Sequence, residues 1–147
     1  IYEQAIMEKF PEFVLNHPYL FSLLFVILTL LIWNIFGDVI GGVKMLTSSQ
    51  VTHLVNREDA EIVDIRSQKE FENGHIINAR NISPKELSKE LDKLRKNNKG
   101  IIFCCSNGSA SVKEAQKLVK QGEEMIFCLK GGITSWQTAS LPLTKKS

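Results

Sequence analysis

Apolar positions are most concentrated between Tyr19 and Phe36, a run of eighteen residues without a formal charge. At about 1.5 Å per residue, a helix of this length covers roughly 27 Å, close to the bilayer's hydrocarbon core of about 30 Å. Tyr19 and Trp33 lie near its two ends, where amphipathic rings prefer the membrane–water interface. The pattern therefore predicts a transmembrane helix over 19–36 in contact with the lipid bilayer, preceded by a juxtamembrane segment over 1–18.

Two other interpretations of this run fit less well. A cleaved signal peptide has an apolar stretch of about 7–15 residues after a basic region and before a small-residue cleavage site, and this pattern lacks those features. A helix packed against the core of a domain this small would keep one polar face toward water, whereas this run is apolar all round. The preceding segment Ile1–His17 could be a helix lying at the membrane surface or a frayed terminus, and its alternating pattern, interrupted by Pro11, leaves both open.

Beyond this run, short apolar segments alternate with amphipathic ones. Strands are predicted at Glu61–Ile65, Ile101–Cys105 and Met125–Leu129, with an extended piece at Ile76–Ile82. Helices are predicted at Gln50–Asn56, Gln68–Glu72, from Ser83-Pro84 through Leu94, at Ser111–Lys120 and around Trp136. Alternation of this kind is typical of βαβ units and of a buried parallel sheet covered on both faces. The glycine pair in Asp38–Leu46 suggests a hinge, so we expect a linker over 37–46 and a domain over 47–147.

Charge is unevenly distributed. The chain carries 18 basic and 16 acidic residues, but residues 1–42 hold only Lys9 against Glu3, Glu8, Glu12 and Asp38. The remainder is mildly basic, with lysines scattered among glutamates rather than gathered in a stripe, so nucleic-acid binding is not expected. Three cysteines, two of them adjacent, make a poor disulfide framework and favour a reducing compartment. Together with the basic C-terminal flank, this places the C-terminal domain in the cytoplasm.

The stretch with candidate chemistry runs from Ile101 to Val119, where a short apolar strand, a loop of small residues and an amphipathic helix follow one another. Cys105 ends the strand. Backbone amides of the loop and the first turn of the helix would both favour negative charge at its sulfur, as a nucleophilic cysteine requires. The alternative is a small buried hydrophobe that ends a core strand. Because ligands bind at the carboxyl ends of parallel strands, the position of Cys105 favours the functional interpretation.

Other candidates point to structure rather than chemistry. Asp64 and Arg66 are expected to pair at a strand end, and His75 to bond nearby backbone. Cys104 should point to the opposite face of the strand from Cys105. Three cysteines without Cys-x-x-Cys spacing fit no zinc pattern, so no metal site is expected. A cysteine phosphatase would need arginine where Ser111 stands.

Several stretches together resemble the rhodanese-like domain. The first is Ile62–Arg66 with Glu70-Phe71 and Gly74-His75-Ile76; the second is Ile101–Ala115; the third is Leu129–Ile133 with Trp136 and Leu141-Pro142-Leu143. The resemblance implies an α/β fold with a five-stranded parallel sheet flanked by helices, here preceded by one N-terminal transmembrane helix. It also implies sulfur transfer through a cysteine persulfide, without a cofactor.

The same resemblance assigns the site. Cys105 takes the place of the sulfur-accepting cysteine, and the residues that would bind substrate are Ser106, Asn107, Gly108, Ser109, Ala110 and the following Ser111. The family's loop commonly closes with arginine, which this chain replaces with Ala110. An anionic donor such as thiosulfate would lose a charge-assisted contact, whereas a protein or small-molecule persulfide would lose less.

Two functions follow from these patterns. The first is a sulfurtransferase of the bacterial inner (plasma) membrane, single-pass, that takes sulfur from a small-molecule or protein donor and passes it to an acceptor. The second is a membrane-tethered rhodanese-like binding or scaffold module that holds a partner, such as a membrane protein, near the bilayer. The stretch from Cys105 to Gly108 favours the enzyme, and Ala110 favours the module.

Overall fold

The computed structural model describes residues 2–36, 39–97 and 99–145, and the chain divides into two units, residues 1–37 and 38–147. The N-terminal unit contains α1 (Tyr2–Asn16) and α2 (Pro18–Phe36). Within α2, residues Pro18–Ile35 are long and apolar enough to cross a membrane, and none of them is buried. By length and composition, α2 has the properties of a membrane span or of a signal sequence near an N-terminus.

The C-terminal unit is built on a sheet of six strands. These are β1 (Val39–Ile40), β2 (Val43–Leu46), β3 (Glu61–Asp64), β4 (Arg80–Asn81), β5 (Ile101–Cys104) and β6 (Ile126–Leu129), in the spatial order β1-β2-β6-β5-β3-β4. All neighbours from β2 to β4 are parallel, which confirms the predicted five-stranded parallel sheet. Only β1 runs antiparallel, against β2.

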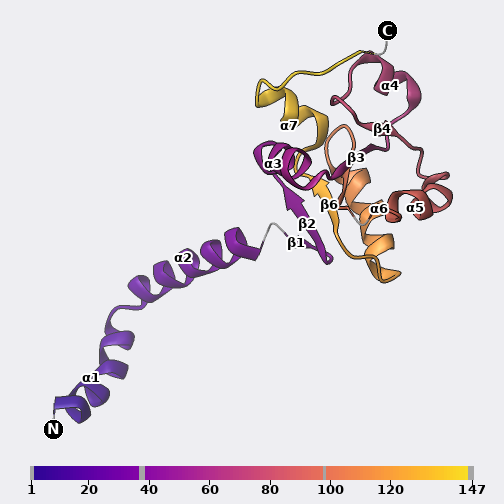
Figure 1. Cartoon of the computed structure of the whole chain (residues 1–147). Helices are drawn as coiled ribbons and strands as arrows, with labels where there is room; N and C mark the ends of the chain where they lie inside the picture. Colours follow the sequence, from indigo (N-terminus) through magenta and orange to yellow (C-terminus); the bar gives the residue numbers. More distant parts are fainter. Residues whose placement is uncertain (1, 37–38, 98, 146–147) are drawn as a thin grey trace. The chain divides into compact units, whose positions relative to one another are not determined.

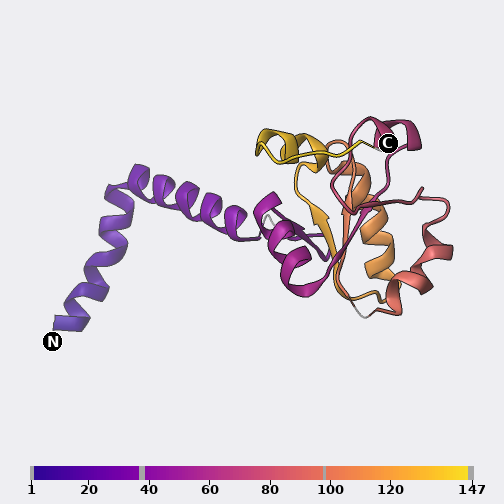
Figure 2. The same ribbon diagram turned by 45° about the horizontal axis from the view of Figure 1, so that its top comes forward.

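Helices cover both faces of this sheet, as Figures 1 and 2 show. The covering helices are α3 (Ser48–Glu58), α5 (Leu87–Arg95), α6 (Ser109–Lys120) and α7 (Gly132–Thr138), while the short α4 (Gln68–Asn73) has no buried residue. One core cluster joins Leu91 of α5 and Leu118 of α6 to Phe103 of β5, while the other joins Val51 of α3 and Trp136 of α7 to the opposite face. Cys105 belongs to the first cluster and Cys104 to the second, as the alternation of side chains along a strand predicts.

Two helices begin with capping boxes. The Thr47 hydroxyl accepts the Gln50 amide at the start of α3, and Ser67 and Glu70 make the same reciprocal pair at the start of α4. The Ser67–Glu70 pair satisfies backbone amides at the start of α4 that have no partner within the helix. It also fixes the position of the Glu70 carboxylate, which reaches the candidate site.

The predicted linker over 37–46 is wrong for residues 39–46. Val43–Leu46 is not a hinge but β2, whose backbone pairs with β6 from Lys44↔Phe127 to Leu46↔Leu129. Gly41 and Gly42 have φ of 57° and 82°, so the glycine pair forms the two-residue turn of a hairpin rather than a flexible joint. Gly37 and Asp38, the other predicted linker residues, lie outside the described residues.

Two helix boundaries also differ from prediction. The helix expected from Ser83-Pro84 begins at Leu87, since Ser83 uses its carbonyl and hydroxyl to form a turn with Glu86 first. The helix expected from Ser111 begins two residues earlier, at Ser109, so two predicted loop residues belong to its first turn.

Candidate active site

Cys105 directly follows β5, and a three-residue loop connects it to α6. Gly108 ends the loop with φ of 95°, in the left-handed region that glycine adopts most easily. A Cβ added there would lie 3.2 Å from the Gly131 amide nitrogen, so the position also has little room for a side chain. Asn107 Oδ1 accepts hydrogen bonds from the Ser109 amide at 3.1 Å and hydroxyl at 2.8 Å, which forms an Asx turn directly before α6.

The sulfur of Cys105 lies against backbone donors. It accepts hydrogen bonds from the amides of Gly108 at 3.0 Å and Ser111 at 3.4 Å. The thiol is also 3.5 Å from the Ser111 hydroxyl, which donates in turn to the Gly108 carbonyl at 3.0 Å. These contacts provide the donor environment expected from the sequence, and amide donors of this kind stabilise an anionic sulfur.

The loop around Cys105 has a buried part, which we call its floor, and an exposed part, which we call its rim. Cys105 is 3% exposed, and Gly108 and Ser111 are also buried. The predicted binding residues Ser106, Asn107, Ser109 and Ala110 are exposed and form the rim. The rim residues are therefore open to a donor, whereas the side chain of Cys105 is almost completely covered.

The N-terminal turn of α7 holds the first half of the loop. The Ile133 amide donates to the Cys105 carbonyl at 2.9 Å, and the Thr134 amide and hydroxyl donate to the Ser106 carbonyl at 3.1 and 2.9 Å. A Cβ added to Gly132 would lie 2.2 Å from the Cys105 carbonyl oxygen, so only glycine permits this approach. The glycine pair Gly131-Gly132 could be recognised in the sequence, but the hydrogen bonds from Thr134 to the loop could not.

Glu70 reaches the rim from α4. Its Oε1 accepts a hydrogen bond from the Ser106 hydroxyl at 3.3 Å. Hydrogen bonds from the Ser67 hydroxyl and amide lower the pKa of Glu70, and the Ser106 bond acts in the same direction. Glu70 therefore presents a carboxylate to the loop, a contact between residues far apart in the sequence that our sequence analysis missed.

A buried ion pair supports the neighbouring strand end. Arg66 Nη2 lies 2.7 Å from Asp64 Oδ2 and also donates to the Gly74 carbonyl at 2.8 Å. Burial opposes the charge on Arg66, but hydrogen bonds and the charge of Asp64 outweigh it and raise the Arg66 pKa. The Asn81 side chain donates to the carbonyls of Asp64 and Arg66. The expected structural role of the pair agrees with these contacts.

The other two thiols are in environments that suppress ionisation. Burial, reinforced by the nearby Asp64 carboxylate, raises the pKa of Cys104 well above its ordinary value. Burial raises the pKa of Cys128 to about 12, against a smaller opposing effect from the Ser111 hydroxyl. All three cysteines are free. Within the described residues, Cys105 is the cysteine whose sulfur accepts hydrogen bonds from loop amides.

His75 and Trp136 have structural contacts. His75 Nδ1 lies 2.7 Å from the Phe71 carbonyl, and its ring stacks on Phe71 with 3.7 Å between centroids. Trp136 is buried and donates from Nε1 to the Pro142 carbonyl at 3.1 Å. Within residues 2–36, 39–97 and 99–145, no group of three or more His, Cys, Asp or Glu side chains could hold a metal ion.

The fold is a five-stranded parallel sheet, and the site is a cysteine at a strand end that a loop and the start of a helix enclose. Comparisons with known proteins identify the class of protein that has this fold and site. The rhodanese-like domain model matches residues 47–139, and this chain belongs to the rhodanese-like domain family. A relative along nearly the whole chain is the uncharacterized protein YibN of Escherichia coli strain K12. It is 31% identical over 143 residues, which cover 95% of this chain and 99% of YibN.

Solved structures show the same fold. A rhodanese-like domain protein from Staphylococcus aureus is 27% identical, with a TM-score of 0.60 over 71% of this chain and 99% of that protein. A thiosulfate sulfurtransferase from Pseudomonas aeruginosa has a TM-score of 0.66 at 22% identity, covering 71% of this chain but only 21% of that protein. These likenesses show that the C-terminal unit shares its fold with both proteins.

Proposed function

We propose that this chain is a membrane-anchored sulfurtransferase that carries sulfane sulfur as a persulfide on Cys105 and passes it to a nucleophilic acceptor. The observation that carries the proposal is the pair of amide hydrogen bonds to the Cys105 sulfur, from Gly108 at 3.0 Å and Ser111 at 3.4 Å. They lie at the carboxyl end of β5, where parallel sheets bind ligands.

The reaction has two half-reactions. The Cys105 thiolate attacks the outer sulfur of the donor, a new S–S bond forms, and the donor's own S–S bond breaks with its electron pair leaving on the donor fragment. The acceptor nucleophile then attacks the outer sulfur of the persulfide, and Cys105 departs as a thiolate. Ping-pong kinetics follow from this order.

The loop residues divide the work between floor and rim. The amides of Gly108 and Ser111 stabilise negative charge on sulfur both before attack and after the acceptor has left. The exposed residues Ser106, Asn107, Ser109 and Ala110 contact the donor and acceptor. Because Cys105 is only 3% exposed, the outer sulfur of the donor must enter between them.

The donor class follows from Ala110 and Glu70. An arginine at position 110 would give a dianionic donor a charge-assisted contact of about 1.5–3 kcal/mol, so its absence weakens use of thiosulfate roughly ten- to hundredfold. The Glu70 carboxylate at Ser106 adds negative charge to the rim. A persulfide on a protein or on a small thiol, which needs less anion recognition, is the favoured donor.

The anchor is α2, with the domain in the cytoplasm of a bacterium and α2 in the inner membrane. Support comes from the uncharged window Pro18–Ile35, none of which is buried, and from the three free cysteines, which suit a reducing compartment. The segments 1–18 and 19–36 remain part of this proposal, and the domain predicted over 47–147 is extended to include β1 and β2.

A second candidate function is a tethered binding module that performs little sulfur transfer. The near-complete burial of Cys105 and the alanine at position 110 favour it. In this case the domain holds a partner near the bilayer, and the loop amides are a remnant of the fold.

The test is mass spectrometry of the full chain in lipid nanodiscs after exposure to a small organic persulfide. We expect one added sulfur atom on Cys105, released as thiocyanate by cyanide and absent in Cys105→Ser. Cys128→Ser, which removes a thiol from the same core cluster, is the matched control and should keep the adduct.

Ala110→Arg separates the two functions. For an enzyme that uses persulfide donors, wild type forms the adduct with the organic persulfide, and Ala110→Arg adds reaction with thiosulfate. If wild type forms no adduct with either donor while Ala110→Arg does, the binding module is the correct function.

A further inference from the structure

The inference concerns α1, the helix that precedes the apolar helix α2. Ile6, Phe10 and Phe13 follow one another at helical spacing along one side of α1, and they are 67%, 59% and 51% exposed. Glu8 and Glu12 lie on the other side, since residues two apart on an α-helix are separated by about 200°, while Glu3, in the first turn, lies at the N-terminal end of the apolar side. These three apolar side chains of α1 therefore remain more than half exposed in the part of this unit that the structure describes.

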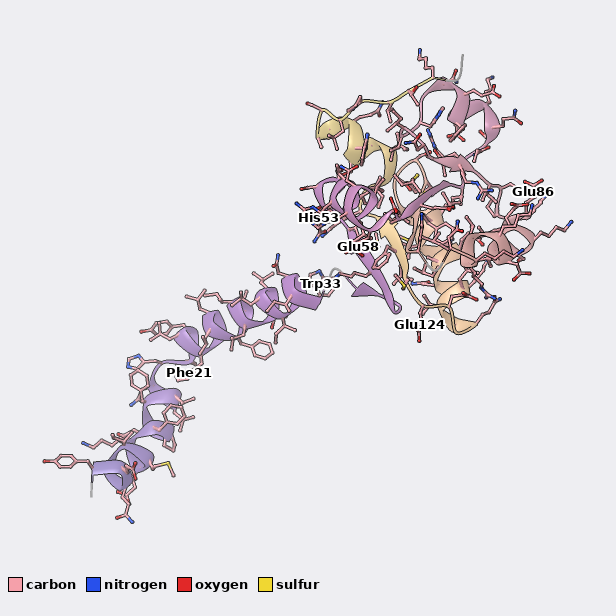
Figure 3. The ribbon with its side chains drawn as sticks, in the orientation of Figure 1. Phe21, Trp33, His53, Glu58, Glu86 and Glu124 are labelled. Carbon is pink, nitrogen blue, oxygen red and sulfur yellow. The ribbon has the colours of Figure 1, made fainter. Side chains whose placement is uncertain are left out.

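That apolar side is continuous with the start of α2. Phe21, in the first turn of α2, contacts Phe10 and Phe13 edge-on, with 6.2 Å between ring centroids in each case. Figure 3 shows Phe21 at the bend between the two helices. Pro18 has no amide hydrogen to continue the helix, and the His17 carbonyl instead accepts the Leu20 amide, so the chain turns here.

Length and charge exclude a second membrane span. Fifteen residues of helix cover about 22 Å, less than the hydrocarbon core, and three charged residues lie within the middle of α1. The bend instead lets α1 leave the direction of α2 at the position where Tyr19 would meet the membrane–water interface. A helix with one apolar side and one charged side is stable in the plane of that interface.

We propose that α1 lies in the interface of the bilayer that α2 spans, with Ile6, Phe10 and Phe13 among the acyl chains and Glu8 and Glu12 toward water. This rests on the membrane span of the proposed function, but not on its sulfur chemistry. Because α1 carries three glutamates and one lysine, apolar contact rather than attraction to anionic lipid holds it there.

The experiment uses the full chain in phosphatidylcholine nanodiscs with the photoreactive residue benzoylphenylalanine at one position. Phe10→benzoylphenylalanine probes the apolar side of α1, and Glu12→benzoylphenylalanine is its matched control on the opposite side. Phe25→benzoylphenylalanine, within α2 and 71% exposed, tests the span itself. Lipid adducts are counted by mass spectrometry after illumination.

We expect lipid adducts at positions 10 and 25 in similar yield, and at least fivefold fewer at position 12. Adding anionic phosphatidylglycerol or raising the salt concentration should leave the yield at position 10 unchanged. Equal yields of lipid adducts at positions 10 and 12 would overturn the interfacial placement of α1 and leave the span intact. A protein adduct at position 10 together with lipid adducts at position 25 would do the same. Absence of lipid adducts at 25 would overturn the span and this inference with it.

Discussion

Thr134 binds the carbonyl oxygen of Ser106 twice, through its amide at 3.1 Å and its hydroxyl at 2.9 Å. The C=O and N–H groups of a trans peptide unit point in opposite directions, so this contact turns the Asn107 amide away from α7. The Ile133 bond to the Cys105 carbonyl does the same for the Ser106 amide. Through these contacts, α7 sets the orientation of a loop that lies 28 residues earlier in the sequence.

Thr134→Val, which removes the hydroxyl and keeps the shape, should slow the formation of the Cys105 persulfide several-fold. One hydrogen bond of about 0.5–1.5 kcal/mol is lost, and the Ser106 peptide gains freedom. The rate is measured by quenching the reaction at successive times and counting the persulfide by mass spectrometry, at several donor concentrations. Thr134→Ser should restore it, and equal rates for the valine and serine variants would show that the hydroxyl does not position the loop.

Gly108→Ala should destabilise the domain and slow persulfide formation. A non-glycine residue at φ of 95° is strained by about 1–2 kcal/mol, and the new Cβ meets the Gly131 amide at 3.2 Å. Gly122→Ala is the matched control, because Gly122 has φ of 89° with nothing within 4 Å of the added Cβ. Urea denaturation should show a larger loss for Gly108→Ala, and only that variant should lose rate.

Removing one member of the Asp64–Arg66 pair should lower the free energy of unfolding by about 3–5 kcal/mol, because the Asp64 side chain is fully buried and the remaining charge is uncompensated. Asp64→Asn and Arg66→Met test the two halves by urea denaturation. The double variant should lose less than the sum of the two single losses. Strict additivity would mean that the two side chains do not stabilise each other.

Glu70 should make the stability of the domain sensitive to acid. Its pKa lies below the ordinary 4.5, so it favours the folded state above that pH, and this contribution is lost as the pH falls through the lowered pKa. The urea midpoint of wild type should therefore fall more between about pH 7 and pH 3 than that of Glu70→Gln, which keeps the capping geometry without the charge. Parallel changes in the two proteins would contradict the assignment.

The strand, loop and helix around Cys105 could be predicted because their signals are local. An apolar run, a cluster of small residues and an amphipathic repeat lie within one stretch, and the alternation along β5 correctly separated Cys104 from Cys105. Thr134 and Glu70 could not be predicted in this way. Each lies tens of residues from Ser106, and only the packing of α4 and α7 brings them to the loop.

The strand at Val43–Leu46 was missed for a different reason. Its four residues include an exposed lysine, and a strand this short gives too little pattern to distinguish it from a linker. Its stability comes from the pairing with β6, which lies more than eighty residues away in the sequence. The small exposed fraction of Cys105 likewise depends on the tertiary packing around it, which no local residue pattern encodes.

The hairpin that turns at Gly41-Gly42 places β1 along the outer side of β2. Without β1, the unpaired backbone of β2 would be an open sheet edge, which favours pairing with a second molecule. A water-soluble fragment that starts at Val43 would therefore be prone to self-association, and one that starts at Thr47 would lose a strand of the sheet itself. Biochemical work on the isolated domain should begin upstream of Val39.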